Sequence, residues 1–348
     1  MISNEAYIEC VPNFSEGRNL ETINAIAEAI RSVDGVRVLH IDRGEAANRT
    51  VITFVGHAMD VVESAFRMVK CASKLIDMRT HQGEHPRIGA TDVLPLIPLK
   101  NITLAECAEL ARALAERIYK ELAIPTYCYE ASAYLPEHVN LADCRRGEYE
   151  GLRDKMLDAV MRPDFGGGEY TLQAARSGAT VVGARNFLIA VNFNLNTESR
   201  EVASAIAARV RASGEVCRDD EGNVVRDEEG GVVRRPGLLR GCKAIGWYIE
   251  EFGCAQVSMN INDVVLCPIH TAYETVCRVA RELGVEVTGT ELIGLIPEDC
   301  MIEAGYYFAT MQGILAQSND ALMQVAVEAM HMDDLCPFDI EQKVLRYL

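Results

Sequence analysis

The sequence predicts an α+β fold made of two subdomains that share one order of elements. In both halves, short segments rich in β-branched residues alternate with segments whose apolar residues recur at helical spacing. The order strand, helix, strand, strand, helix, strand occurs once in each half, which is the order of a ferredoxin-like (βαββαβ) unit. The chain has 348 residues, enough for two domains, and we expect them at 1–184 and 185–348.

The first half shows clear boundaries between its elements. We expect strands at 7–14, 36–44, 49–56, 92–99 and 124–130, and helices at 20–33, 58–77 and 103–123. The start of the last helix is the best defined, because Thr103 precedes the apolar run and Glu106 follows three residues later. This spacing predicts a capping box.

The second half repeats the order. We expect strands at 187–195, 242–251, 255–263 and 285–295, and helices at 199–212 and 270–284. A βαββαβ unit leaves one face of its antiparallel sheet without helices. Two such units in one chain can turn these faces toward each other, so the sequence predicts facing sheets that enclose a substrate cleft or tunnel.

Three segments interrupt the pattern. The segment 162–185 is rich in glycine and lies at the junction of the halves. The segment 218–237 contains R-D-x-E-G-x-V-V-R twice, eight residues apart, which predicts a solvated β-hairpin excursion. The tail 331–348 is partly apolar, and we expect it to pack back onto the body.

Composition excludes several classes of partner. The formal net charge of −17 argues against nucleic acid and against an anionic membrane, because both bind basic surfaces. No apolar run approaches the roughly 20 residues of a membrane span, and the N-terminus has no secretory pattern. The twelve cysteines include no C-x-x-C pair. We therefore expect a cytoplasmic protein with reduced thiols and no cysteine-built metal cluster.

The segment 81–93, HQGEHPRIGATDV, places two histidines, a glutamate, an arginine and an aspartate within twelve residues. Its letters fit the H-x-x-E-H pattern of a class of zinc peptidases, which places both histidines on one face of a helix. Gly83 weakens such a helix, and Pro86 pushes His85 out of the helical region. We therefore expect a loop rather than a zinc site, and no bound metal.

A loop that presents His85 beside Glu84, Arg87 and Asp92 suits acid–base chemistry. The pKa of histidine lies near neutral pH, so a modest shift makes the ring a proton donor or acceptor. The alternative is a structural or surface histidine. The close spacing of these titratable residues favours the functional interpretation, because catalytic and binding residues often lie on loops of a rigid scaffold.

Other polar positions are weaker candidates. Asn13 lies at the end of the first strand and begins a polar stretch where a small ligand can dock, or where a helix merely begins. Amides and a hydroxyl alternate along two strands of the second half, at Asn192, Asn194, Gln256, Ser258 and Asn260. Such side chains on a cleft-facing sheet make good hydrogen-bond ligands. Cys10 and Cys267 have no base beside them, so buried thiols are favoured over nucleophiles.

Several stretches together resemble the formiminotransferase family. They are IECVPNFSEGRN, NRTVITFVG, LIDMRTHQGEHPRIGATDVLPLIP, PDFG, GATVVGAR, KAIGWYIEE and HTAYETVCRVARELG. The resemblance runs from about residue 7 to the end. It implies two α/β subdomains whose sheets form a substrate tunnel. It also implies transfer of a formimino group between N-formimino-L-glutamate and tetrahydrofolate, the co-substrate, during histidine breakdown.

The resemblance also implies roles for single residues. The general acid–base histidine of the family lies in its G-E-H-P-R motif, which is His85 here. The folate-contacting loop follows P-D-F-G and maps onto Gly166, Gly167 and Gly168 through Gly178. We expect Arg49 and Arg87 to bind substrate carboxylates in a locally positive cleft, Glu84 or Asp92 to orient His85, and Asn13 to contact substrate.

Two further functions stay open at this stage. A folate-binding family member with altered activity would transfer a formyl group between 5-formyltetrahydrofolate and glutamate, and a metallohydrolase is the more distant alternative. The resemblance suggests a homodimer. It also suggests a stand-alone transferase, with a separate cyclodeaminase in the pathway.

Overall fold

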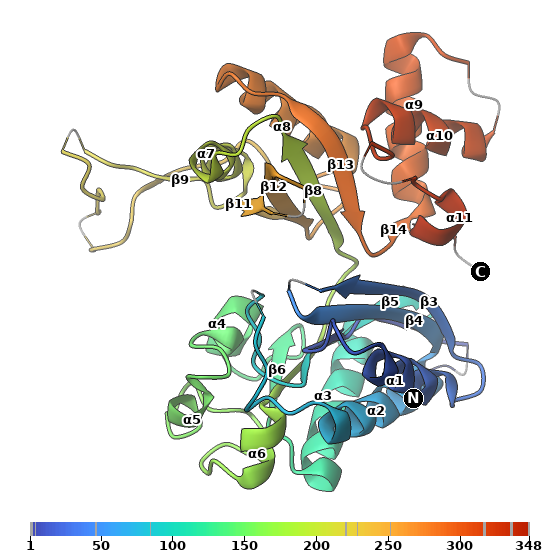
Figure 1. The fold of residues 1–348 in the computed structure, drawn as a ribbon, viewed down its shortest axis with the longest axis vertical. Helices are drawn as coiled ribbons and strands as arrows, with labels where there is room; N and C mark the ends of the chain where they lie inside the picture. The colour runs from blue at the N-terminus through green and yellow to red at the C-terminus, as the bar shows by residue number, and fades with distance from the viewer. Residues whose placement is uncertain are drawn as a thin grey trace. The chain divides into compact units, whose positions relative to one another are not determined.

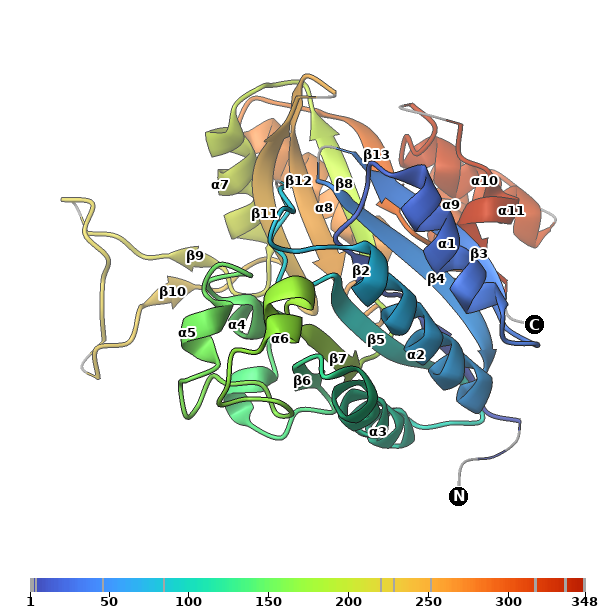
Figure 2. The ribbon, with the colours of Figure 1, turned by 60° about the horizontal axis from the view of Figure 1, so that its bottom comes forward.

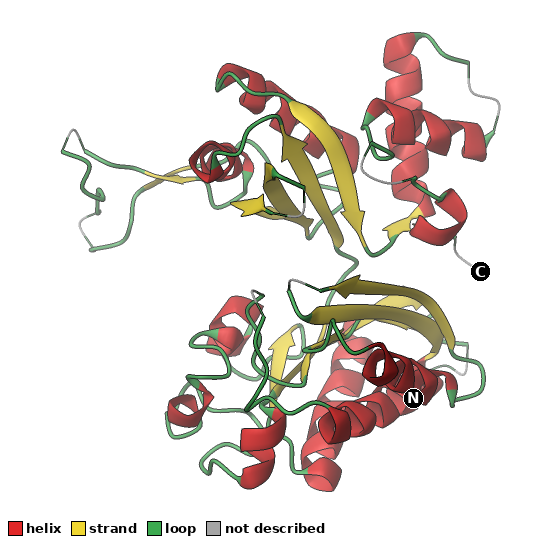
Figure 3. Cartoon of the chain, viewed as in Figure 1, coloured by secondary structure: helices red, strands yellow, loops and turns green. Residues whose placement is uncertain are grey.

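The computed structural model describes residues 3, 5–45, 47–83, 85–219, 221–227, 229–250, 252–315, 318–334 and 337–346. The chain divides into two compact units, Met1–Asn186 and Phe187–Leu348. Each unit has its own sheet and its own apolar core. Helices and strands occur in both units (Figure 3), so the predicted α+β class is confirmed.

The first unit contains a sheet of seven strands (Figure 1). They are β1 (Tyr7–Cys10), β2 (Asn13–Phe14), β3 (Arg37–Gly44), β4 (Arg49–His57), β5 (Thr91–Lys100), β6 (Thr126–Glu130) and β7 (Thr180–Ala184). β1 and β2 both lie between β4 and β5, with β3 paired to β4 at one edge. Beyond β5 the sheet continues through β7 to β6, and these two added pairings are parallel.

Three long helices cover one face of this sheet. They are α1 (Leu20–Arg31), α2 (Ala58–Leu75) and α3 (Leu104–Leu122). The predicted capping box starts α3: Thr103 accepts from the Glu106 N–H, and Glu106 accepts from the Thr103 N–H. Apolar side chains at helical spacing on these helices pack against alternate residues of the strands.

The other face of the first sheet carries polar side chains. Ile8 and Cys10 of β1 belong to the core below the helices. Glu9, which lies between them, points to the opposite face because strand side chains alternate. Over β6 and β7 this second face is covered by shorter elements. They are η1 (Pro136–His138), α4 (Leu141–Arg145), α5 (Leu152–Lys155) and α6 (Leu172–Ser177), which share a smaller core with the strands.

The second unit is built around four antiparallel strands. They are β8 (Ile189–Leu195), β11 (Cys242–Ile249), β12 (Cys254–Ile261) and β13 (Val287–Ile293), in the sheet order β11-β12-β8-β13. Two helices, α7 (Arg200–Val210) and α8 (Ile269–Glu282), share a core with one face of this sheet. Apolar residues at alternate strand positions fill that core, and the amides lie on the other face.

Further helices and strands complete the second unit. They are β9 (Glu215–Val216), β10 (Arg234–Arg235), β14 (Ile296–Pro297), α9 (Glu298–Gln312), α10 (Asn319–Ala329), α11 (Ile340–Lys343) and β15 (Val344–Leu345). β9 and β10 pair antiparallel at the base of an extended arm (Figure 2). The predicted excursion is therefore confirmed for its described residues, but its paired strands begin before 218, and between them only two isolated bridges form, Arg218 with Val224 and Arg226 with Val232. The tail also packs as predicted, because β15 pairs with β14.

The strand β7 was not predicted. The sequence pattern marked 162–185 as an interruption, but its last part forms α6 and the buried strand β7. β7 lies between β5 and β6, so it is central to this end of the sheet. Glycines on both sides of its short apolar run hid the strand pattern.

Replacing Gly305 with alanine tests the close crossing of α9 and α10. Helix propensity alone favours alanine by about 1 kcal/mol. However, a Cβ on Gly305 would lie 1.9 Å from the carbonyl oxygen of Leu322. Relieving that overlap costs about 1–3 kcal/mol or more, so we expect Gly305→Ala to lower the free energy of unfolding measured with denaturant. Thr310→Ala, an exposed change on α9, should change it by less than about 0.5 kcal/mol. A Gly305→Ala protein more stable than wild type would contradict this close contact between α9 and α10.

Candidate active site

The segment 81–90 leads from α2 into β5 and contains no helix among its described residues. The prediction of a loop is therefore confirmed, although Glu84 lies outside the described residues. Nε2 of His81 lies 3.0 Å from the carbonyl oxygen of Asn48, and its Nδ1 lies 3.3 Å from Nε of Arg87. Both ring nitrogens of His81 are thus occupied by the protein itself.

Asn48 ties this loop to the turn after the first strand. Its Nδ2 donates to the carbonyl of Gln82 at 2.8 Å, and its Oδ1 accepts from the N–H of Gly17 at 2.9 Å. Gly83 packs directly on the same turn, since a Cβ there would lie 2.3 Å from the carbonyl oxygen of Ala47. The glycine of the G-E-H-P-R motif therefore permits backbone to approach backbone.

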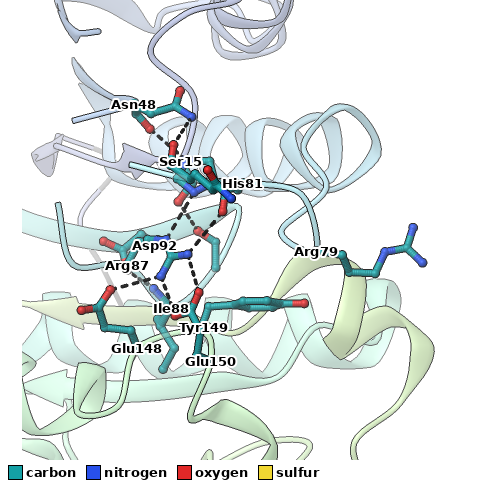
Figure 4. A network of polar contacts seen from close by, with 12 residues as sticks. Ser15, Asn48, Arg79, His81, Arg87, Ile88, Asp92, Glu148, Tyr149 and Glu150 are labelled. Atoms are coloured by element: carbon teal, nitrogen blue, oxygen red, sulfur yellow. Dashed lines mark hydrogen bonds and ion pairs between the residues drawn. The ribbon is translucent and has the colours of Figure 1, made fainter. Parts of the chain in front are cut away.

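The guanidinium of Arg87 is buried and uses all five of its N–H donors (Figure 4). Glu150 accepts two bonds of 2.7 Å, and Glu148 accepts a third of 3.1 Å. Nε donates to Nδ1 of His81, and Nη2 donates to the His81 carbonyl at 3.4 Å. A substrate carboxylate at Arg87, as the sequence predicts, would have to displace one of these protein partners.

The far end of the loop is fixed by the segment before β7. The N–H of Ala179 donates to the carbonyl of Ile88 at 3.1 Å, and the N–H of Ala90 donates to Ser177 at 2.8 Å. Gly178 permits this pairing, because its φ is +67° and a Cβ on it would lie 2.1 Å from the Ile88 oxygen. Gly178 thus contacts the histidine loop, whereas its predicted contact with folate is not tested by this geometry.

His85 is half-buried in the fixed loop and presents one nitrogen as a proton acceptor. Its Nδ1 lies 2.7 Å from the carbonyl oxygen of Pro86. A carbonyl only accepts, so Nδ1 carries the proton and Nε2 carries the lone pair. Burial, together with the positive charges of Arg49 and Arg145, lowers the pKa of His85 to about 3. The ring is therefore neutral at physiological pH.

The charges of two arginines and one aspartate act on the imidazole of His85. Asp92 is buried; it accepts from the N–H of Ile88 at 3.0 Å and forms an ion pair with Arg145. Arg49, at the start of β4, forms no ion pair with a described residue, and its buried Nε has no hydrogen-bond partner there. Burial and the charge of Arg145 lower the pKa of Arg49 to about 10, so it stays positive.

Arg145 is the member of this group that the sequence did not identify. It ends the short helix α4, more than fifty positions after Asp92 in the chain. The only local signal is the adjacent pair Arg145–Arg146, and pairs of basic residues are common on surfaces. Folding, rather than spacing, brings Arg145 to the site.

Buried polar atoms without hydrogen-bond partners gather on the polar face of this sheet. In the described part of the first unit they include both carboxylate oxygens of Glu9, Oδ1 of Asn13, Nε of Arg49, Nδ1 of His57 and Oγ1 of Thr91. Buried polar groups in proteins are nearly always paired. Burial also raises the pKa of Glu9 to about 7, against the opposing charge of Arg185. This face is therefore chemically suited to a polar ligand.

The three glycines predicted to bind folate are Gly166, Gly167 and Gly168. They form a turn beside β6. A Cβ on Gly166 would lie 2.6 Å from the ring of Tyr119. The N–H of Gly168 donates to the carbonyl of Met156 at 2.7 Å. None of the hydrogen bonds of this turn within the described chain reaches His85. The structure thus brings His85, Arg49 and Asp92 together electrostatically.

The remaining predictions concern thiols, metals and membranes. Cys10 and Cys267 are buried free thiols, and burial raises the pKa of Cys10. Within the described ranges, no group of three or more His, Cys, Asp or Glu side chains is arranged to hold a metal ion. Among the described helices, none combines the length and the apolar character that crossing a bilayer requires.

The fold is that of an α+β protein with two units. Its candidate site combines a histidine with two arginines in the first unit. Two family models match the chain: "Formiminotransferase domain, N-terminal subdomain" over residues 7–185 and "Formiminotransferase domain" over residues 190–348. The chain therefore belongs to the formiminotransferase family, and the resemblance seen in its motifs is confirmed.

Curated relatives agree with this assignment. The chain is 40% identical to rat formimidoyltransferase-cyclodeaminase over 98% of its own length and 59% of that protein. It is 40% identical to the glutamate formimidoyltransferase of Streptococcus pyogenes serotype M1, over 88% of this chain and 94% of the relative. A Thermoplasma acidophilum protein of the same name is 37% identical over 88% and 93%. The chain thus spans about three fifths of the fused relative.

Replacing Arg87 with lysine tests whether this guanidinium fixes the loop. An ammonium has three donors, so at least two of the five bonds are lost while the carboxylates and His81 remain. We expect the free energy of unfolding of the first unit to fall by about 2–3 kcal/mol in denaturant melts. Arg79→Lys is the matched control, because Arg79 lies in the same connection but is exposed (Figure 4). If Arg87→Lys and Arg79→Lys lowered the free energy of unfolding equally, this would contradict the proposal that Arg87 fixes the loop.

Proposed function

We propose that this protein transfers the formimino group from N-formimino-L-glutamate to tetrahydrofolate. The observation that carries the proposal is a neutral imidazole in the loop before β5, on which the charges of two arginine side chains act. Membership of the formiminotransferase family supports it. The relatives named glutamate formimidoyltransferase, of which the chain covers more than nine tenths, support the substrate.

Arg49 and Arg145 bind the carboxylates of formiminoglutamate. This substrate has two carboxylates, and a guanidinium binds a carboxylate through two parallel bonds. Arg49 is the better placed of the pair, because no described acidic side chain forms an ion pair with it and its buried Nε lacks a partner. The local charge is positive although the whole chain carries −17.

His85 manages the protons of the transfer. N5 of tetrahydrofolate attacks the formimino carbon, and Nε2 of His85 accepts the proton that this nitrogen loses. The tetrahedral intermediate then collapses: the bond from carbon to the glutamate nitrogen breaks, and His85 returns the proton to that nitrogen. A formimino group has moved, glutamate has left as an amine, and His85 is neutral again.

Substrate binding adjusts the basicity of His85. In the free protein the neighbouring cations disfavour a proton on the ring, which lowers its pKa to about 3. A bound carboxylate offsets the charge of Arg49, so the pKa rises toward the reference value of histidine, where proton transfer is most effective. The base therefore becomes competent when its substrate is present.

The other predicted residues receive supporting roles in this proposal. Asp92 holds Arg145 and, as a negative charge near His85, favours the protonated ring. Arg87 keeps the loop in place rather than binding substrate. Asn13 offers its unpartnered Oδ1 to a ligand donor. Contacts of folate with the glycine turn 166–168, with Gly178 and with Glu84 stay predictions.

The finer description of the fold belongs to the same proposal. We assign both units to the ferredoxin-like class, supported by the equivalent strand orders β3-β4-β1-β5 and β11-β12-β8-β13. Subdomain boundaries at 1–184 and 185–348 are supported by the matched ranges. Sheets that enclose the substrates are an expectation from the family resemblance, consistent with one polar face on each sheet. The homodimer, the cytoplasmic location and the separate cyclodeaminase stay predictions.

A direct assay tests the function and the histidine together. We expect the wild type to consume formiminoglutamate only when tetrahydrofolate is present. His85→Gln should lower kcat by about 10²–10⁴-fold, the usual contribution of a general acid–base group. His331→Gln, an exposed change in the second unit, is the control and should leave kcat unchanged. An unaffected His85→Gln enzyme would remove His85 from the mechanism. A wild type that moves only formyl groups from 5-formyltetrahydrofolate would support the alternative function.

Arg49→Gln tests the electrostatic link between substrate and base. Loss of a charged carboxylate partner should raise KM for formiminoglutamate by about 10–100-fold. Removing a positive charge also favours protonated His85, so its pKa should rise in the free protein. The acid limb of kcat/KM should then move to higher pH, because a general base must be unprotonated. Arg43→Gln, on the neighbouring strand β3 and exposed, should change neither quantity. A raised KM with an unmoved pH profile would contradict the link.

A further inference from the structure

A cavity of the first unit is lined by none of the charged groups that set the pKa of His85. It opens where the C-terminal ends of α2 and α3 meet the short helix α6 (Figure 1), and its volume is about 380 Å³. Pockets that bind small molecules measure about 300–1,000 Å³. The lining includes Lys70, Lys74, Glu121, Leu122, Gln173 and Arg176. We call this cavity the α2–α3–α6 pocket.

The α2–α3–α6 pocket is locally positive. Lys70 and Lys74 lie one helical turn apart on α2, so their side chains share one face of the helix, and Arg176 of α6 adds a third cation. Among the described residues, neither lysine forms an ion pair. The carboxylate of Glu121 is already bound outside the lining, because its Oε1 lies 2.8 Å from Nε of Arg117. Three cations therefore meet in the pocket without a carboxylate to neutralise them.

The guanidinium of Arg176 is held in place but keeps donors for a ligand. Its Nη2 donates to the carbonyl of Lys74 at 2.8 Å, and its Nε donates to the carbonyl of Ser73 at 3.4 Å. These carbonyls belong to the last turn of α2, where backbone acceptors have no partner within the helix. Nη1 donates to no described residue, so it remains for a ligand. The partners are uncharged, so Arg176 keeps its full positive charge.

Gln173 adds a neutral acceptor to the lining. Its Nε2 donates to Oγ of Ser177 at 2.9 Å, which fixes the amide and leaves Oε1 as the free end. An amide oxygen accepts from a hydroxyl or an N–H. Gln173 lies three residues before Arg176 on α6, so the two side chains share one face of this helix. The pocket therefore offers a hydrogen-bond acceptor beside its cations.

These groups define the chemistry of a ligand. A phosphate monoester carries a charge of about −1.5 to −2 near neutral pH and has three acceptor oxygens. Lysine binds phosphate as a point charge, and arginine adds directed N–H donors. A carboxylate has only two oxygens, in one plane, so it meets fewer of the donors that converge from α2 and α6. A cavity with charges of one sign concentrates its field, although the whole chain carries −17.

We propose that the α2–α3–α6 pocket binds a small phosphate monoester that carries hydroxyl groups. Lys70, Lys74 and Arg176 hold the phosphate, and Oε1 of Gln173 accepts from a hydroxyl of the ligand. The proposal goes beyond the proposed function and is independent of it, since neither formiminoglutamate nor tetrahydrofolate is a phosphate ester. The ligand is a further small molecule, bound by residues that the transfer does not use.

A ligand in this pocket also holds together segments that flank the histidine loop. The carbonyl of Arg176 accepts from the N–H of Met78 at 2.8 Å, in the connection that leaves α2. The next carbonyl, that of Ser177, accepts from the N–H of Ala90 at 2.8 Å, just before β5. A phosphate that bridges α2 and α6 adds to these contacts in the folded state only. Binding should therefore raise the Tm of the first unit.

Isothermal titration calorimetry tests the pocket without any turnover. Glycerol 3-phosphate is the probe, in a phosphate-free buffer of low ionic strength. Glycerol controls for the hydroxyl groups, and succinate is a carboxylate probe of similar charge. We expect glycerol 3-phosphate to bind with a Kd of about 1 mM or lower, succinate to bind more weakly, and glycerol not to bind. Added salt should weaken the binding, because the lysines are exposed.

The double substitution Lys70→Gln with Lys74→Gln removes two charges and keeps the helix, since glutamine and lysine have similar helix propensities. We expect Kd for glycerol 3-phosphate to rise by about tenfold, as loss of two exposed charge contacts predicts. Glu121→Gln has the opposite sign and should lower Kd by about two- to fivefold. Lys120→Gln, an exposed change on α3 outside the lining, is the matched control and should leave Kd unchanged. Unfolding curves confirm that each variant folds.

Arg49→Gln separates the pocket from the arginines of the candidate active site. This variant should bind glycerol 3-phosphate as tightly as wild type. Affinity lost in Arg49→Gln but kept in the double lysine variant would overturn the proposal, because the anion would then bind at the active site. The proposal also fails if wild type does not bind glycerol 3-phosphate, or if wild type binds succinate more tightly.

Discussion

The buried guanidinium of Arg87 is the constraint on which the candidate active site depends. A buried cation is tolerated only when its donors are satisfied, and here two glutamates and His81 satisfy them all. Arginine cannot accept a hydrogen bond, so it also fixes the tautomer of His81. The protonated Nε2 of that ring then bonds to Asn48, which holds the turn after the first strand. One charge thus aligns three distant segments around His85.

Electrostatics explains why a strongly acidic chain can act on an anionic substrate. Net charge acts over long distances and is screened by salt, whereas a partly buried pair of guanidiniums acts at close range in a medium of low dielectric constant. The same pair disfavours protonation of His85, and in the proposed mechanism a bound substrate carboxylate relieves this effect. A base with a low pKa in the free protein is therefore consistent with catalysis, because the relevant value is that of the complex.

Much of this arrangement was predictable from local sequence, and the remainder depends on tertiary structure. Pro86 and Gly83 excluded a helix at the histidine loop, and Thr103 with Glu106 located the start of α3 correctly. Alternation along β8 and β12 predicted that their amides share one face. β7 escaped prediction because it is five residues long and flanked by glycine. Arg145 escaped because its role arises only where α4 meets Asp92, a contact that no local pattern encodes.

The two units share one strand order but carry polar side chains of different charge. In each, helices cover one face of an antiparallel core, so the other face is free to vary without disturbing the apolar packing. In the first unit, Arg49 of the sheet interacts electrostatically with Arg145 of α4 and with His85 of the loop before β5. In the second unit, the open face carries amides around a carboxylate. Because side chains alternate strictly along a strand, each polar residue can change while its neighbours keep the core intact. A repeated scaffold can therefore carry different polar side chains on its two open faces while both apolar cores are kept.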